Sequence, residues 1–188
     1  MPDEQLELPL HITLKNDLPL TLRLGMPEDA EQLVAYFEQV AGETDFLGFG
    51  SSDFGVSVEE EREFLRQYAK DPNSLYLIAD VAGEIAGALS FTPGKRLRFK
   101  HAGVFGISIL RKYWGSGLGS RLLGYLIAWA RQNGTIRKIN LVVRADNLSA
   151  IRLYEKYGFV KEGHIAREIY VRGEFFDSYA MGLKIDPQ

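Results

Sequence analysis

A short glycine-rich stretch is the first feature of this chain that could do chemistry. Gly115-Ser116-Gly117-Leu118-Gly119 follows an apolar run at 104–110 and precedes a segment at about 117–132 with apolar residues at helical spacing. A glycine turn between a strand and a helix points unpaired main-chain N–H groups at the positive end of the helix, and the missing side chains let a phosphate approach closely. The stretch therefore indicates a pyrophosphate site, although a purely structural turn would have the same letters.

Two familiar nucleotide-binding motifs do not fit this stretch. The dinucleotide fingerprint needs a third glycine where Ser120 stands, and an acid about 20 residues later, where Ile139 and Asn140 stand. A Walker loop needs Gly-Lys followed by Ser or Thr, and no such triplet occurs. A nucleotide-dependent oxidoreductase is therefore disfavoured.

A second motif, NxxAxxLYxxxGF, occupies residues 147–159. On a helix, Asn147, Ile151 and Tyr154 lie on one face. Core packing of Tyr154 and Tyr157 is the alternative interpretation, because helical aromatic residues usually face the core.

Taken together, the two motifs, with a strand between the two helices, resemble the GNAT superfamily of N-acetyltransferases over about residues 75–185. The segment Glu43–Leu47, His101, and the ending at 176–183 are further similar to small bacterial members near the ribosomal-protein acetyltransferase group. The resemblance implies an enzyme that uses acetyl-CoA as co-substrate and moves its acetyl group to a primary amine by direct attack in a ternary complex.

The resemblance also implies which residues hold acetyl-CoA. The pyrophosphate would lie on the glycine loop, the pantetheine arm would pair with the strand before it, Asn147 would contact that arm, and Tyr154 would hydrogen-bond the thioester sulfur and protonate the departing thiolate. The implied cofactor-binding residues are Ile107, Ser108, Ile109, Trp114, Gly115, Ser116, Gly117, Leu118, Gly119, Ser120, Asn147 and Tyr154.

The sequence departs from the family pattern at two positions. Trp114 stands where an Arg or Gln usually leads the loop, and Val104 stands where many members place a glutamate as general base. An alkylammonium must lose a proton before it attacks a thioester. We therefore expect Glu43 to act as a catalytic base, and Glu43, Asp45, Phe46 and Tyr170 to bind the acceptor. Solvated loop acids and a packed edge-strand aromatic are the alternative interpretations.

Charge is segregated along the chain. Residues 85–145 hold eleven Lys and Arg and no acid, whereas residues 28–63 hold eleven acids and one base. The basic segment fits the phosphates of CoA, and the acidic segment would attract a cationic amine. Two solvated faces of opposite sign are the alternative. The net charge of −3 argues against a nucleic-acid partner.

Composition limits the remaining possibilities. The 188 residues include 46% hydrophobic residues, no cysteine and three histidines without metal-ligand spacing, so we expect one domain over 1–188 and no metal. The first residues are acidic and the longest apolar stretch is short, so we expect a cytoplasmic protein without membrane contact. A homodimer is possible, and the first 18 or so residues would form an extra strand or a loose extension.

These residues need a sheet and four helices to position them. Strands are expected at 10–14, 20–24, 75–81, 85–91, 104–110, 139–143, 159–171 and 175–185. Helices are expected after Pro27, after a capping box at Ser57, at 117–132, and from Asn147 to near Gly158. This order predicts an α/β (α+β) domain with a central mixed, mostly antiparallel sheet flanked by helices.

The acceptor stays open at this point. A small molecule and a peptide are both possible amine substrates, and a ribosomal-protein-type N-terminal acetyltransferase is one alternative. A second alternative is a non-catalytic acyl-CoA-binding sensor, because the glutamate that many family members use as the base is missing from the strand.

Overall fold

The computed structural model describes residues 6–50 and 54–186. Its strands are β1 (Leu10–Thr13), β2 (Pro19–Leu24), β3 (Leu75–Val81), β4 (Glu84–Pro93), β5 (Ala102–Ile109), β6 (Lys138–Arg144), β7 (Val160–Val171) and β8 (Glu174–Lys184). Its helices are α1 (Ala30–Glu43), α2 (Val58–Lys70), α3 (Leu118–Asn133) and α4 (Leu148–Lys156). Short 3-10 turns lie at Lys15–Asp17, Pro27–Asp29, Leu97–Phe99 and Arg111–Tyr113.

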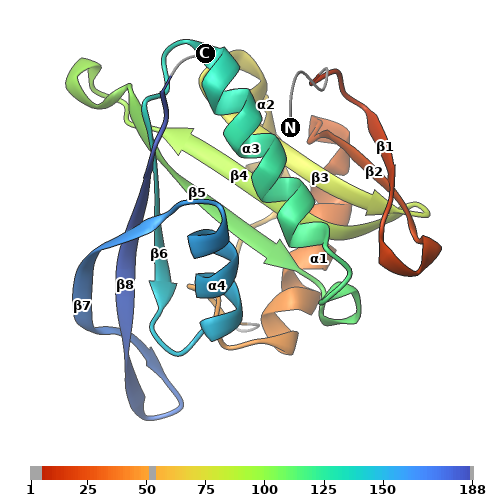
Figure 1. Ribbon diagram of the computed structural model, residues 1–188. Coiled ribbons are helices and arrows are strands. Elements are labelled where there is room, and N and C mark those ends of the chain that lie inside the picture. Colours follow the sequence, from red (N-terminus) through yellow and green to blue (C-terminus); the bar gives the residue numbers. More distant parts are fainter. Residues whose placement is uncertain (1–5, 51–53, 187–188) are drawn as a thin grey trace.

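The strands form one sheet in the order β1-β2-β3-β4-β5-β6-β8-β7. All neighbours are antiparallel except β5 and β6, which are parallel. In Figure 1, α3 and α4 lie in front of this sheet and α1 and α2 lie behind it. The predicted α+β fold with a mixed, mostly antiparallel sheet is confirmed.

Two apolar clusters hold the helices to the sheet. Leu118, Leu122 and Leu126 of α3 pack with residues such as Phe91 and Phe105 on one face. On the other face, residues of α1 and α2 pack with β3 and β4, and the cluster there includes no residue of β6, β7 or β8 among those described. On this face of the sheet, that cluster therefore does not cover β6, β7 and β8.

Local sequence signals explain several boundaries. The Ser57 capping box is confirmed, because Ser57 Oγ accepts from the Glu60 N–H and Glu60 accepts from the Ser57 N–H. Asn147 Oδ1 accepts from the Ala150 N–H at 3.2 Å and caps α4. The segment after Pro27 begins with a 3-10 turn, and α1 follows from Ala30. None of the described helices combines the length and hydropathy needed to cross a bilayer.

Candidate active site

The parallel strands β5 and β6 separate soon after they begin. Ala102, Gly103 and Val104 pair with Lys138, Ile139 and Asn140, and no later pair joins the two strands in the described residues. β5 stays paired with β4 as far as Ile109, while β6 continues beside β8. The side of β5 that faces β6 is therefore an unpaired edge over residues 105–109.

Register shows which main-chain groups face this unpaired edge. Leu110 donates to Ala86, and Gly94 donates to Ala102, so the even-numbered residues of β5 direct their polar groups toward β4. Phe105, Ile107 and Ile109 direct theirs toward the gap. An extended amide-containing chain can pair with such an edge as an added strand would.

The N-terminus of α3 follows directly after this edge. Gly115 and Gly117 have φ of 75° and 91°, and a Cβ at either would meet no atom within 4 Å. In the part of the chain that the structure describes, the N–H groups of Gly117, Gly119 and Ser120 have no hydrogen-bond partner. Free N–H groups at the positive end of a 16-residue helix fit a pyrophosphate.

The side chains in this loop support the turn. Ser116 Oγ donates to the Tyr113 carbonyl at 2.7 Å, and Leu118 is buried in the core. Trp114 Nε1 donates to the Ile109 carbonyl at 2.8 Å, which occupies the last acceptor of the β5 edge. The glycine loop therefore leaves main-chain N–H groups available, and their binding of an anion stays a prediction.

Tyr154 lies on the α3–α4 side of the gap. Its ring contacts Phe105 and Phe159 at centroid distances of 5.7 and 5.9 Å, and Phe105 is the first β5 residue beyond the pairing with β6. Burial raises the pKa of Tyr154 to about 12. Its hydroxyl has no hydrogen-bond partner among the described residues. It is therefore a protonated donor at neutral pH.

Tyr157 holds α4 against α3. Its hydroxyl donates to the Ser120 carbonyl at 2.7 Å and lies 3.4 Å from the position of a Cβ on Gly124. This contact fixes Tyr154 relative to the glycine loop.

The opposite face of β5 meets α1. Ser108 Oγ lies 2.9 Å from the Tyr36 hydroxyl, and burial raises the pKa of Tyr36 above its ordinary value. The Ser108 side chain forms part of the α1–α2 face, and the prediction that the strand at 107–109 holds the cofactor concerns its main chain. The gap between β5 and β6 is the place where this face and the Tyr154 face meet.

Glu43 is the last residue of α1, not a loop residue as predicted. Its Oε2 accepts from the Arg111 N–H at 2.5 Å, and its carbonyl accepts from the Arg111 guanidinium. Arg111 follows the C-terminal end of β5. Glu43 is thus held near that end of the strand, its carboxylate by a main-chain N–H and its carbonyl by the Arg111 side chain.

Arg144 is a residue that sequence reasoning missed. It is buried at the end of β6, donates to both Asp146 oxygens at 3.0 and 2.6 Å, and donates to the Asp45 carbonyl at 2.8 Å. Its guanidinium lies 4.9 Å from the Phe46 ring and 3.7 Å from the Phe176 ring. A charged residue that ends a buried strand run was the available signal. Arg144 attaches the α1–α2 loop to β6 and β8.

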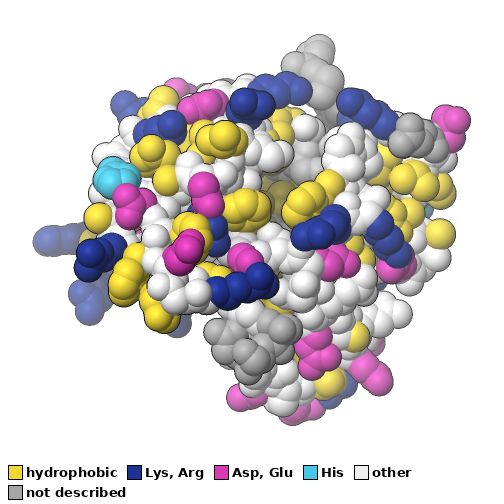
Figure 2. Space-filling model, turned by 90° about the horizontal axis from the view of Figure 1, so that it is seen from below, with side chains coloured by type: hydrophobic (Ala, Val, Ile, Leu, Met, Phe, Trp, Pro, Cys, Tyr) yellow, Lys and Arg dark blue, Asp and Glu magenta, His cyan; other side chains and the backbone are white. Residues whose placement is uncertain are grey.

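The β7–β8 hairpin meets the same loop. Arg172 Nη2 lies 3.2 Å from Asp45 Oδ1, and Tyr170 is 63% exposed and packs on Phe175. The structure thus brings Asp45, Phe46 and the hairpin near Tyr170 together. Figure 2 views the molecule from this end and shows a hollow near its middle, with hydrophobic side chains on its walls and charges of both signs at its rim.

The structure bears on the two charge predictions in different ways. Asp45 pairs with Arg172, whereas the Glu43 carboxylate accepts from two neutral donors, the Arg111 main-chain N–H and the Gln39 side chain. Attraction of a cationic amine by Glu43 stays a prediction. Lys112 pairs with Glu84, and Lys95 to Lys100 lie before the start of β5, at the other end of that strand from the glycine loop. The basic segment of the sequence is therefore not one phosphate site.

An open strand edge, a free helix N-terminus and a buried phenol thus lie around the gap between β5 and β6. The acetyltransferase (GNAT) family model matches residues 32–159, and the chain belongs to this family. It is an acetyl-CoA-dependent N-acetyltransferase.

Three known proteins illustrate the likeness. The chain is 32% identical over 113 residues to the L-amino acid N-acetyltransferase AaaT of Escherichia coli K12, which covers 60% of this chain and 70% of AaaT. A GNAT-family acetyltransferase from Streptococcus pneumoniae is 39% identical, with a TM-score of 0.86 over 89% of this chain and 99% of its own. yncA of Salmonella typhimurium, solved with acetyl-CoA, is 20% identical and shares the fold, with a TM-score of 0.79 over 90% and 95% of the two chains.

Proposed function

We propose that this enzyme transfers the acetyl group directly to a primary amine within a ternary complex, at the gap between β5 and β6. The observation that carries this proposal is the unpaired edge of β5 at 105–109, which lies between the free N–H groups of α3 and the Tyr154 hydroxyl. Bound acetyl-CoA supplies an activated acyl group as its thioester.

The chain's own residues have separate tasks in this proposal. The main chain of Gly115–Ser120 binds the pyrophosphate, and Ile107, Ser108 and Ile109 supply the strand that holds the pantetheine arm, with Asn147 beside it. Ile109 offers its N–H only, because Trp114 occupies its carbonyl. These contacts hold the thioester near Tyr154.

Proton movement follows from the two faces of the gap. The amine approaches from the α1–α2 face and Glu43 accepts its proton directly or through one water. As the nitrogen–carbon bond forms and the carbon–sulfur bond breaks, the Tyr154 hydroxyl donates its proton to the leaving sulfur. Its raised pKa keeps the phenol protonated for this step. Tyr154 then regains a proton from solvent.

The acceptor contacts lie around the α1–α2 loop. Phe46, held over Arg144, supplies an apolar wall, and Asp45 and Tyr170 lie at the rim beside Arg172. Because Asp45 is paired with Arg172, we propose that the Glu43 carboxylate is the group that meets the acceptor's amine.

Thiol release with a panel of amines tests the proposal. The chain has no cysteine, so a thiol reagent reports only the CoA released. Amine-dependent release with intersecting initial-rate lines is expected, and no acetyl group should remain on the protein when acetyl-CoA is given alone. Binding of acetyl-CoA without release for any amine would favour the acyl-CoA sensor, and an acetylated protein would exclude direct transfer.

A further inference from the structure

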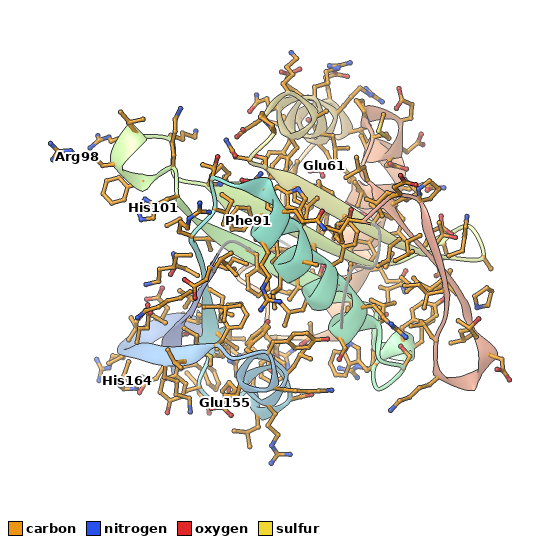
Figure 3. The ribbon with its side chains drawn as sticks, turned by 45° about the horizontal axis from the view of Figure 1, so that its top comes forward. Glu61, Phe91, Arg98, His101, Glu155 and His164 are labelled. Atoms are coloured by element: carbon orange, nitrogen blue, oxygen red, sulfur yellow. The ribbon has the colours of Figure 1, made fainter. Side chains whose placement is uncertain are left out.

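The connection between β4 and β5, residues 94–101, protrudes from the body of the molecule (Figure 1). We call it the basic turn. It holds Lys95, Arg96, Arg98 and Lys100 without an acid, and Leu97 and Phe99 are 82% and 59% exposed. Figure 3 shows Arg98 at its outer end, pointing away from the body, and His101 at its base.

The four Lys and Arg side chains of this turn are not used in ion pairs within the described part of the protein. They also lie at the wrong end of β5 for CoA, because an eight-residue strand, roughly 26 Å long, separates them from the glycine loop. Exposed bases beside exposed apolar side chains are therefore left for another partner.

A hollow of about 630 Å³ joins the basic turn to the acceptor side of the sheet. It is lined by Thr92, Arg96, Phe99, Val104 and Asn140, among others. Thr92 and Val104 are paired across β4 and β5, and Tyr68 of α2 contacts Thr92, so the hollow lies on the α1–α2 face.

The hollow also leads toward the reacting groups. Val104 is 54% exposed and directly precedes Phe105, which the Tyr154 ring contacts. At about 3.3 Å per strand residue, the path from Phe105 to Ala102 is about 10 Å, which an extended peptide covers in about three residues, and the basic turn lies beyond Ala102. Val104 gives this path an apolar floor without the negative charge of a glutamate.

We propose that the acceptor is the N-terminus of a polypeptide with acidic residues about four to six positions after its amine, and that the basic turn binds these acids. This inference rests on the proposed function, because it assumes that the amine reacts at the gap between β5 and β6. The free positive charge, the exposed apolar side chains of Leu97 and Phe99, and the distance along β5 from Phe105 to the basic turn all match such a chain.

The test compares two ten-residue peptides with free N-termini, one with glutamates at its fourth to sixth positions and one with glutamines there. We expect kcat/KM to be about 10-fold higher for the glutamate peptide at low salt, as two or three exposed charge pairs of about 2-fold to 4-fold each would give. The preference should shrink in roughly 0.5 M salt because screening weakens exposed pairs.

Variants assign the preference to the basic turn. Arg96→Gln with Arg98→Gln should lower kcat/KM for the glutamate peptide to that of the glutamine peptide and leave the latter unchanged. Arg131→Gln with Lys156→Gln removes the same charge from two exposed positions elsewhere and should preserve the preference. Equal rates for both peptides in the wild type, or an equal loss for both in the basic-turn variant, would overturn the inference.

A binding measurement separates this inference from the proposed function. Fluorescence anisotropy of the glutamate peptide, labelled at its C-terminus, is followed with CoA present. Binding that the basic-turn variant loses, without acetylation of any peptide or small amine, supports the docking surface and refutes the proposed function. Thiol release with small amines but no peptide binding refutes the inference alone. A wild-type dimer that the variant converts to monomers, with no peptide preference, would make the turn a contact between copies and also overturn it.

Discussion

Replacing Tyr154 by phenylalanine isolates one hydroxyl group. The ring keeps its contacts with Phe105 and Phe159, and the lost hydroxyl has no hydrogen-bond partner among the described residues. The free energy of unfolding should therefore change by no more than about 1 kcal/mol. The affinity for acetyl-CoA should also stay within about 3-fold, because the main chain of the glycine loop and of β5 is untouched.

The effect on turnover should be much larger. A positioned general acid contributes about 10²- to 10⁴-fold, so kcat should fall at least 100-fold. The pH profile gives a second magnitude, because an ordinary tyrosine with a pKa of about 10 would be half ionised at pH 10. With its pKa raised to about 12, Tyr154 stays about 99% protonated there. The wild-type kcat should therefore hold up to about pH 11 and fall only above it.

Thiol release measured at saturating acetyl-CoA and amine from pH 7 to 11 checks both magnitudes. Calorimetry with acetyl-CoA and urea unfolding serve as the controls for binding and folding. A phenylalanine variant with wild-type kcat would show that Tyr154 only packs in the core and that its hydroxyl is not the general acid. A wild-type kcat that is halved near pH 10 would refute the argument that burial sets this pKa.

Three further changes test other parts of the site. Glu43→Gln should lower kcat/KM for amines at least 10-fold and leave acetyl-CoA binding intact, and wild-type kinetics across an amine panel would leave the base unassigned. Arg144→Met removes the contacts to the Asp146 carboxylate and the Asp45 carbonyl, so urea unfolding should show a free energy of unfolding lower by about 2–4 kcal/mol. The KM for the acceptor should rise more than the KM for acetyl-CoA. Unchanged stability would contradict this. Ser57→Ala should cost about 1 kcal/mol in the same assay through loss of the α2 cap, with no change in kcat.

Local signals in the sequence were sufficient for most of the elements. Asn147 caps its helix, Gly134 ends α3 with φ of 77°, and the turn at Ala82 and Gly83 joins β3 to β4. Each of these boundaries depends on a few residues that are neighbours in the sequence, so the types and spacing of those residues are enough to predict it. The glycine loop was predicted for the same reason.

Contacts between distant segments were not predictable in this way. Arg144 meets Asp45 across 99 positions, and Glu43 meets Arg111 across 68. Nothing in the sequence therefore indicated that Asp45 pairs with Arg172, or that a main-chain N–H of a distant residue holds the Glu43 carboxylate. Likewise, one uninterrupted basic segment of the sequence is divided in space. Residues 95–100 lie before the start of β5, and Arg111 lies after its end.

The central claim is that acetyl-CoA binds with its pyrophosphate at the N-terminus of α3. Its most direct test is the calorimetric Kd of acetyl-CoA for Gly117→Asp beside Gly134→Asp. Both glycines have positive φ, at 91° and 77°, and open space where a Cβ would stand, so the two variants carry similar backbone strain at opposite ends of one helix. Only the first would place a carboxylate among the phosphates. We predict that Gly117→Asp weakens binding at least 30-fold and that Gly134→Asp stays within about 2-fold of the wild type. A wild-type Kd for folded Gly117→Asp, or equal losses in both variants, would contradict the account.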